Sequence, residues 1–87
     1  MKLKVQPSFE RDVKRAPRHI ILQLNVLLDS IIAAGSLSDI PNLKKLSGYK
    51  NAYRIRINDY RLGFVLEDNV IVLMRLLSRK DVYRHFP

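Results

Sequence analysis

The most informative segment of this sequence reads AYRIRINDYRLGFVL and runs from residue 52 to residue 66. Apolar and basic residues alternate through its first half, as in a β-strand with one buried and one exposed face. Asn58-Asp59 then interrupts the alternation, and such a pair is typical of a tight hairpin turn. The segment therefore predicts two antiparallel strands, at residues 52–57 and 60–66.

Counting outward from that turn pairs the residues of the two strands. Arg56 is expected to face Arg61, and Arg54 to face Gly63, so three guanidinium groups share one face of the hairpin. Directly opposed residues have Cβ atoms about 5 Å apart, where like charges repel. Guanidinium groups hold phosphate oxygens through paired hydrogen bonds, so we interpret the cluster as phosphate-binding and Gly63 as space for a ligand. The structural alternative is that the arginines splay into water or meet an acidic partner protein.

The rest of the chain supplies an α+β frame for this hairpin. We expect, in chain order, a short strand at 2–6, a helical hairpin over 8–34, a loop, the strands at 52–57, 60–66 and 70–77, and a last helix or turn at 80–86. Ser8 is the expected N-cap, Pro17 belongs in the first turn of the second helix, and Gly35 stops that helix. The predicted order is β-α-α-β-β-β-(α), with the helical hairpin packed on one face of a twisted, mainly antiparallel four-stranded sheet. With 87 residues, the chain is expected to form a single domain, 1–87.

Composition narrows the classes of function. The sequence has no cysteine, which excludes a disulfide framework and a thiolate metal site. Its first residues lack the apolar run of a signal peptide, and residues 20–34 are too short and too polar to span a bilayer. We therefore expect a cytoplasmic protein that uses no membrane, no metal and no small-molecule cofactor.

The charge is strongly positive and unevenly distributed. Sixteen Lys and Arg stand against eight Asp and Glu, and the formal net charge is +8. Residues 44–87 hold ten basic and four acidic side chains, whereas residues 1–43 hold six and four. This asymmetry favours a polyanionic partner such as nucleic acid, against the alternatives of a merely solubilising charge or an anionic membrane surface. The basic residues outside the hairpin that we assign to RNA binding are Lys44, Lys45, Lys50, Lys80 and Arg84.

The C-terminal segment brings further candidates for the same site. A strand that ends near Ser78 would deliver Arg79 beside the polar face of the hairpin. Tyr83, four residues later, would return over that face if the segment is helical, and a tyrosine there can stack on a base or act in proton transfer. Its alternative role is that of a core or rim aromatic. His85 is a candidate general acid, although a histidine near a terminus is more often a surface residue.

The second helix carries an additional apolar line. Its broad apolar face includes Ile32, but Leu22, Val26 and Ala33 fall on a separate line flanked by polar residues. Exposed apolar patches usually mark interfaces, so this line predicts docking of a partner helix. The alternative is that the loop at 36–47 partly covers it.

Four segments together resemble the RelE/ParE toxin superfamily of type II toxin–antitoxin systems. They are SFERDVK at 8–14, LSG at 46–48, YRIRINDYRL at 53–62 and SRKDVYR at 78–84, and the resemblance extends over nearly the whole chain. It implies a toxin that cuts mRNA on the ribosome without a metal and that a cognate antitoxin protein blocks. It also implies catalytic roles for Arg54, Arg56, Arg61, Arg79 and Tyr83.

The resemblance leaves three functions open. The first is a ribosome-dependent endoribonuclease in which the RNA 2′-hydroxyl attacks the adjacent phosphate. The second is a ParE-like inhibitor of DNA gyrase, since the superfamily fold serves both activities. The third is a catalytically weak relative that acts only in its antitoxin complex. RelE-type enzymes often have lysines where this chain has Arg54 and Arg56, and an arginine is a poor general base because it stays charged.

Overall fold

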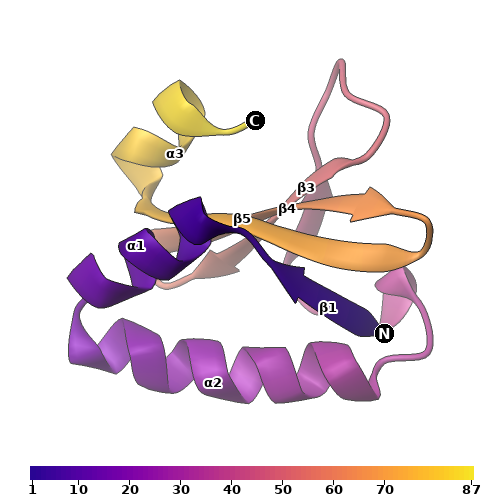
Figure 1. Ribbon diagram of the computed structural model, residues 1–87, viewed down its shortest axis with the longest axis horizontal. Coiled ribbons are helices and arrows are strands. Elements are labelled where there is room, and N and C mark those ends of the chain that lie inside the picture. Colours follow the sequence, from indigo (N-terminus) through magenta and orange to yellow (C-terminus); the bar gives the residue numbers. More distant parts are fainter.

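The computed structural model describes residues 1–87, in which a central sheet carries helices on both faces (Figure 1). The elements are β1 (Lys2–Val5), α1 (Pro7–Arg15), α2 (Arg18–Ala33), a 3-10 turn (Leu37–Asp39), β2 (Leu43–Lys45), β3 (Ala52–Ile57), β4 (Tyr60–Glu67), β5 (Val70–Ser78) and α3 (Arg79–His85). The strand order is β1-β5-β4-β3-β2, and only the β1–β5 pair is parallel. The predicted α+β class and mainly antiparallel sheet are confirmed. No helix has the length and apolar character that crossing a bilayer demands.

The prediction of four strands was wrong, because the sheet has a fifth. β2 lies within the expected loop and pairs antiparallel with β3, so that Lys44 stands opposite Arg54. A strand of three residues is too short to show an alternating pattern. The added strand makes β2 the edge of the sheet beside the hairpin.

The β3–β4 hairpin has the predicted register. Ile57 pairs with Tyr60, and Arg56 pairs with Arg61 across the turn. Asn58 adopts a φ of 59°, a left-handed conformation that asparagine tolerates better than most residues. The local sequence thus fixes which side chains share each face of the hairpin.

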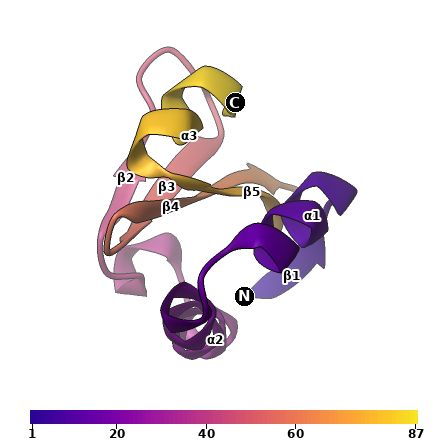
Figure 2. The same ribbon diagram turned by 90° about the vertical axis from the view of Figure 1, so that its left-hand side faces the viewer.

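The larger core lies between the sheet and the helices α1 and α2; in Figure 2, α2 lies below the sheet and α1 at its right-hand end, near β1 and β5. It buries twelve apolar side chains from the helices, the strands and the intervening loop: Phe9, Ile20, Leu24, Ile31, Ile40, Ile55, Ile57, Leu62, Phe64, Ile71, Leu73 and Leu76. Ile32, which was expected on the apolar face of α2, is 57% exposed. The apolar face of α2 is therefore narrower than its sequence suggested.

Two predicted helix signals were misplaced. The N-cap of α1 is Gln6 rather than Ser8, and the Ser8 hydroxyl instead donates a hydrogen bond to the Met74 carbonyl at 2.7 Å. Pro17 is the N-cap of α2, just before its first turn, and Ala34 caps its end ahead of Gly35. The Ser8 hydroxyl thus satisfies the Met74 carbonyl of β5 instead of capping α1.

The helix α3 covers part of the opposite face of the sheet. Val82 and Phe86 are buried there against Ala52 of β3. A Cβ atom built on Gly63 would lie 2.7 Å from the Phe86 ring, so glycine is required for this packing. The expectation that Gly63 leaves space for a ligand was therefore wrong, because the aromatic ring fills that space.

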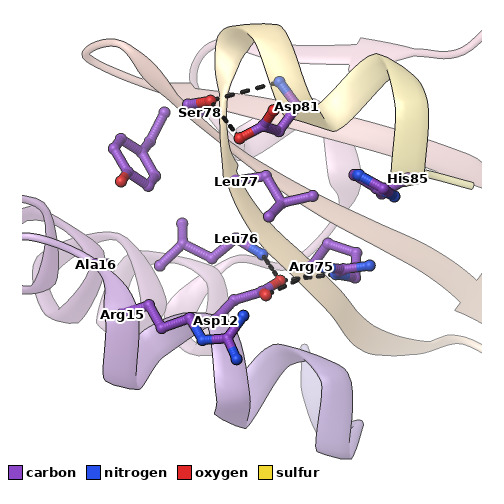
Figure 3. A pocket seen from close by; sticks show the side chains of 10 residues that line it. Asp12, Arg15, Ala16, Arg75, Leu76, Leu77, Ser78, Asp81 and His85 are labelled. Atoms are coloured by element: carbon purple, nitrogen blue, oxygen red, sulfur yellow. Dashed lines mark hydrogen bonds and ion pairs between the residues drawn. The ribbon is translucent and has the colours of Figure 1, made fainter.

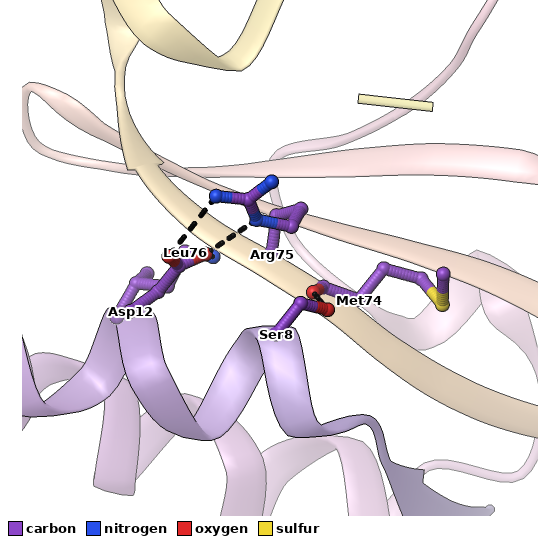
Figure 4. Close-up of polar contacts among 5 residues, drawn as sticks. All are labelled: Ser8, Asp12, Met74, Arg75 and Leu76. Atoms are coloured by element: carbon purple, nitrogen blue, oxygen red, sulfur yellow. Dashed lines mark hydrogen bonds and ion pairs between the residues drawn. The ribbon is translucent and has the colours of Figure 1, made fainter. Parts of the chain in front are cut away.

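The free edge of β5 is closed by α1 (Figure 4). β1 pairs only with the first half of β5, and beyond it the Asp12 carboxylate accepts a hydrogen bond from the Leu76 amide at 2.9 Å. The same carboxylate binds Arg75 through Nε at 2.7 Å and Nη2 at 3.1 Å. A β-bulge shifts the register after Gly63, which turns Arg75 out of the core and toward this partner.

Candidate functional site

Three strand ends and the start of α3 meet at the hairpin turn. Tyr60, the first residue of β4, pairs with Ser78, the last residue of β5. The Arg79 amide then donates a hydrogen bond of 2.8 Å to the Asp59 carbonyl in the turn. This bond holds Arg79 at the end of the hairpin that carries Arg56 and Arg61, as the sequence predicted.

Arg61 is the central residue of this region, and its side chain is only 7% exposed. Its Nη1 donates to the carbonyls of Asn58 and Tyr60, both at 2.9 Å, which ties the guanidinium to the turn. Its Nε is buried and has no hydrogen-bond partner. A buried donor left unpaired adds to the cost of burying this guanidinium.

The surroundings of Arg61 are positively charged. Burial and then the charge of Arg54 lower the pKa of Arg61, Tyr83 acts in the opposite direction, and Arg56 and Arg79 lower it further. The structure therefore brings the three other arginines and Tyr83 close enough to Arg61 to affect its pKa. We call Arg54, Arg56, Arg61 and Arg79 the arginine cluster.

A hollow of about 220 Å³ opens at the arginine cluster. Its wall is formed by Asn42, Leu43, Lys44, Arg54, Arg56 and Arg61. No carboxylate lines it, so nothing within the chain neutralises these charges. Fixed cationic donors around a space of this size form a binding site for an anion such as a phosphate.

The remaining basic candidates are spread over both faces. Lys44 lines the hollow, whereas Lys45 pairs with Tyr53 and so projects toward the opposite face of the sheet. Lys80 borders a separate shallow pocket with Arg79. Lys50 and Arg84 are exposed, in the loop before β3 and on α3 respectively. Of the five predicted RNA-binding residues, only Lys44 lies in the wall of the hollow.

Tyr83 and His85 lie on different sides of α3. Tyr83 is 65% exposed and lies near enough to Arg61 to affect its pKa. His85 instead lines a cavity of about 320 Å³ that also contains Asp12 and Arg75 (Figure 3). The structure therefore separates His85 from the arginine cluster.

The apolar line on α2 borders a groove of about 560 Å³. Leu22 and Val26 form one wall, and Pro41 and residues of β3, including Arg56, form the other. Leu22 is 55% and Val26 is 68% exposed, so most of their surface is open to solvent, although Pro41 and Asn42 of the loop at 36–47 line the same groove. Ala33 is exposed but does not line this groove. Because Arg56 also lines the hollow, the groove and the arginine cluster are continuous.

Sequence reasoning missed two features of this region. Asn42 lines both the groove and the hollow, and no pattern in the sequence marked it. Asp12 is the partner of Arg75, a contact that the sequence did not predict. A lone arginine in an otherwise apolar central strand was a signal that some carboxylate had to meet it.

Comparison with known proteins agrees with this geometry. A family model described as "ParE toxin of type II toxin-antitoxin system, parDE" matches residues 3–83. Toxin RelE3 from Methanocaldococcus jannaschii is 35% identical over 88 residues, which cover 100% of both chains. A chain of the RelB-RelE antitoxin-toxin complex from Methanococcus jannaschii has a TM-score of 0.82 and 33% identity over 97% of this chain and 99% of that one. The YoeB dimer from Staphylococcus aureus has a TM-score of 0.71 and 28% identity over 90% and 95% of the two chains.

Proposed function

The chain belongs to the RelE/ParE toxin family of type II toxin–antitoxin systems, and from that membership we propose that it is an endoribonuclease that cuts mRNA on the ribosome. The observation that carries this proposal is Arg61, a buried guanidinium with an unpaired Nε, in a cluster of arginines that has no carboxylate in its hollow. A phosphodiester group bound in the hollow would supply the missing negative charge.

The proposed reaction is attack of an RNA 2′-hydroxyl on the adjacent phosphate. The attack forms a bond from the 2′-oxygen to phosphorus and concentrates negative charge on the phosphorane oxygens. Guanidinium groups held in place before the reaction stabilise that charge, and removing one such donor typically slows a reaction by about 10²- to 10³-fold. Arg54, Arg56, Arg61 and Arg79 take this role, and each stays charged throughout.

Tyr83 is the proposed proton-transfer group on the α3 side of the cluster. Its hydroxyl both donates and accepts a hydrogen bond, so it can relay the proton of the attacking 2′-hydroxyl to water. Its high exposure leaves it accessible to a nucleotide bound over the arginines. We do not include His85 in the site, because it faces the other side of α3.

The experiment that tests the proposal is cleavage of a defined mRNA on purified ribosomes. The chain should cut the mRNA within the ribosomal decoding site and leave a 2′,3′-cyclic phosphate and a 5′-hydroxyl end. Mapping the cut and the chemistry of both ends checks the result. Intact mRNA combined with failure of DNA supercoiling by gyrase would favour the gyrase inhibitor instead. This second function is considered because the matching family model is described as a ParE toxin.

We also propose that a cognate antitoxin docks on the groove beside α2. The similar chain from Methanococcus jannaschii was crystallised in a RelB-RelE antitoxin-toxin complex. In this chain the exposed Leu22 and Val26 offer an apolar wall, and Arg56 at the far side offers a charge to an acidic segment. A protein bound there would reach the hollow, since Arg56 belongs to both.

The antitoxin proposal is tested by the double variant Leu22→Asp/Val26→Asp. Binding of the antitoxin encoded next to this chain should weaken by well over tenfold, because docking would bury two carboxylates without partners. Val5→Asp, at an exposed apolar residue of β1, is the control. Unchanged affinity of the double variant in calorimetry would remove the groove from the interface.

A further inference from the structure

Besides Tyr83 on its α3 side, the arginine cluster has one more group that can give up a proton, and this group lies at the β2 edge. The proposed reaction breaks the bond from phosphorus to the 5′-oxygen, and that oxygen must receive a proton as it leaves. A guanidinium stays charged in proteins and cannot supply it, whereas a lysine ammonium can. Lys44 is the only lysine in the wall of the hollow, and no histidine or carboxylic acid lies there.

The position of Lys44 follows from the strand that the sequence did not reveal. β2 pairs with β3 so that Lys44 stands directly opposite Arg54 and shares its face of the sheet. Arg54 in turn stands opposite Gly63 of β4, so the order across this face is β2, β3, β4. The chain has one ion pair, between Asp12 and Arg75, and the Lys44 ammonium is therefore free of any carboxylate.

Lys44 and Tyr83 lie on opposite sides of the cluster. α3 packs over β4 and β5, whereas β2 is the edge strand beyond β3. Neighbouring strands lie about 4.8 Å apart, which puts β2 roughly 10 Å from β4. In an in-line displacement at phosphorus the attacking and leaving oxygens are at opposite ends, so the two proton transfers also occur at opposite ends.

We infer that Lys44 is a further catalytic residue, which protonates the leaving 5′-oxygen; this inference rests on the proposed ribonuclease function. As the 2′-oxygen bonds to phosphorus and its proton passes through Tyr83 to water, the bond from phosphorus to the 5′-oxygen breaks. The Lys44 ammonium gives that oxygen a proton and is reprotonated by water. The products are a 2′,3′-cyclic phosphate and a 5′-hydroxyl end.

The test compares Lys44→Arg with the wild-type chain on two ribosome-bound mRNAs. One is an ordinary mRNA, and the other carries a single sulfur in place of the 5′-oxygen at the mapped cleavage position. Lys44→Arg keeps the charge but not the transferable proton, so it should cut the ordinary mRNA at least about 10²-fold more slowly, at the low end of general-acid effects. It should cut the sulfur-containing mRNA within a few-fold of the wild-type rate, because a thiolate leaves without a proton.

The control variant is Lys4→Arg, at an exposed lysine on the opposite edge strand, which should match the wild type on both mRNAs. Two results would overturn the inference: Lys44→Arg cutting the ordinary mRNA at the wild-type rate, or Lys44→Arg being equally slow on both mRNAs. The first would mean that only the charge matters, and the second that Lys44 positions the RNA. If the wild-type chain cut neither mRNA, the proposed function itself would fail, and the inference with it.

Discussion

Arg61 and Arg75 lie on the neighbouring strands β4 and β5, but their surroundings differ completely. Arg75 donates two hydrogen bonds to Asp12, and that contact raises its pKa. Arg61 is more deeply buried, has no carboxylate partner, and has its pKa lowered by burial and by neighbouring arginines. The fold thus neutralises the half-buried Arg75 and leaves the buried Arg61 without a compensating charge.

The contrast distinguishes a structural arginine, Arg75, from Arg61, which we propose to be functional. Taking a charge out of water is unfavourable unless a partner meets it, so a fold selected only for stability would pair both residues. Arg75 and Asp12 hold α1 against β5, which is a structural task. Arg61 retains an unsatisfied donor beside three more arginines, and this arrangement becomes favourable only when an anion is bound.

The largest effect is expected on the structural side of this contrast. Asp12→Ala leaves the Arg75 guanidinium without its carboxylate and removes the acceptor of the Leu76 amide. It should lower the free energy of unfolding by about 3–5 kcal/mol, the usual result of breaking a buried pair from one side. Urea unfolding measures this, with Glu10→Ala at an exposed position on the same helix as the control. A loss below about 1 kcal/mol, within the range of surface pairs, would contradict a structural role for the pair.

The next largest effect is expected on the rate of mRNA cleavage, when an arginine of the cluster is removed. Arg79→Ala removes an exposed guanidinium whose side chain makes no hydrogen bond within the chain, so the unfolding free energy should change by less than about 0.5 kcal/mol. Cleavage of ribosome-bound mRNA should slow by about 10²- to 10³-fold, since one charge-stabilising donor is lost. Single-turnover rates check this, with the exposed Arg11→Ala as the control. Full activity would place Arg79 outside the site.

A smaller effect tests the packing that holds α3 beside the cluster. Gly63→Ala puts a methyl group against the Phe86 ring, and such overpacking typically destabilises by about 1–3 kcal/mol. Adding Phe86→Leu should recover part of that loss, because the smaller side chain leaves room. Thermal unfolding of the single and double variants measures both changes. Additive losses in the double variant would show that the two residues do not meet.

The smallest effect concerns the electrostatics of binding. Each phosphate contact with single-stranded RNA contributes about 0.7 to the slope of log affinity against log salt concentration. Arg56→Ala should reduce that slope by about this amount for a short RNA, whereas Arg11→Ala should leave it unchanged. Fluorescence anisotropy over a range of salt concentrations measures the slope. An unaltered slope for Arg56→Ala would exclude a phosphate contact by that residue.

The sequence predicted the parts of the fold that depend on neighbouring residues. The alternation around Asn58-Asp59 gave the hairpin and its register, because a tight turn fixes the pairing locally. The same register placed Arg54, Arg56 and Arg61 on one face of the hairpin. The predicted C-terminal helix brought Arg79 and Tyr83 near Arg61.

The features that escaped prediction depend on contacts between distant segments. β2 is too short to have a pattern, and only its pairing with β3 makes it a strand. The partner of Arg75 depended on a β-bulge and on a helix more than sixty residues away. Likewise, Gly63 looked open because nothing in its own segment showed that Phe86 would return over it.

The most direct test of this account is the rate at which Arg61→Met cuts ribosome-bound mRNA, measured where circular dichroism shows that the variant is folded. Methionine keeps an unbranched side chain but removes the uncompensated charge. The variant should cut more slowly than the wild-type chain by about 10²- to 10³-fold. A rate within a few-fold of the wild type would contradict it, because the one buried arginine without a partner would then have no part in holding the RNA phosphate.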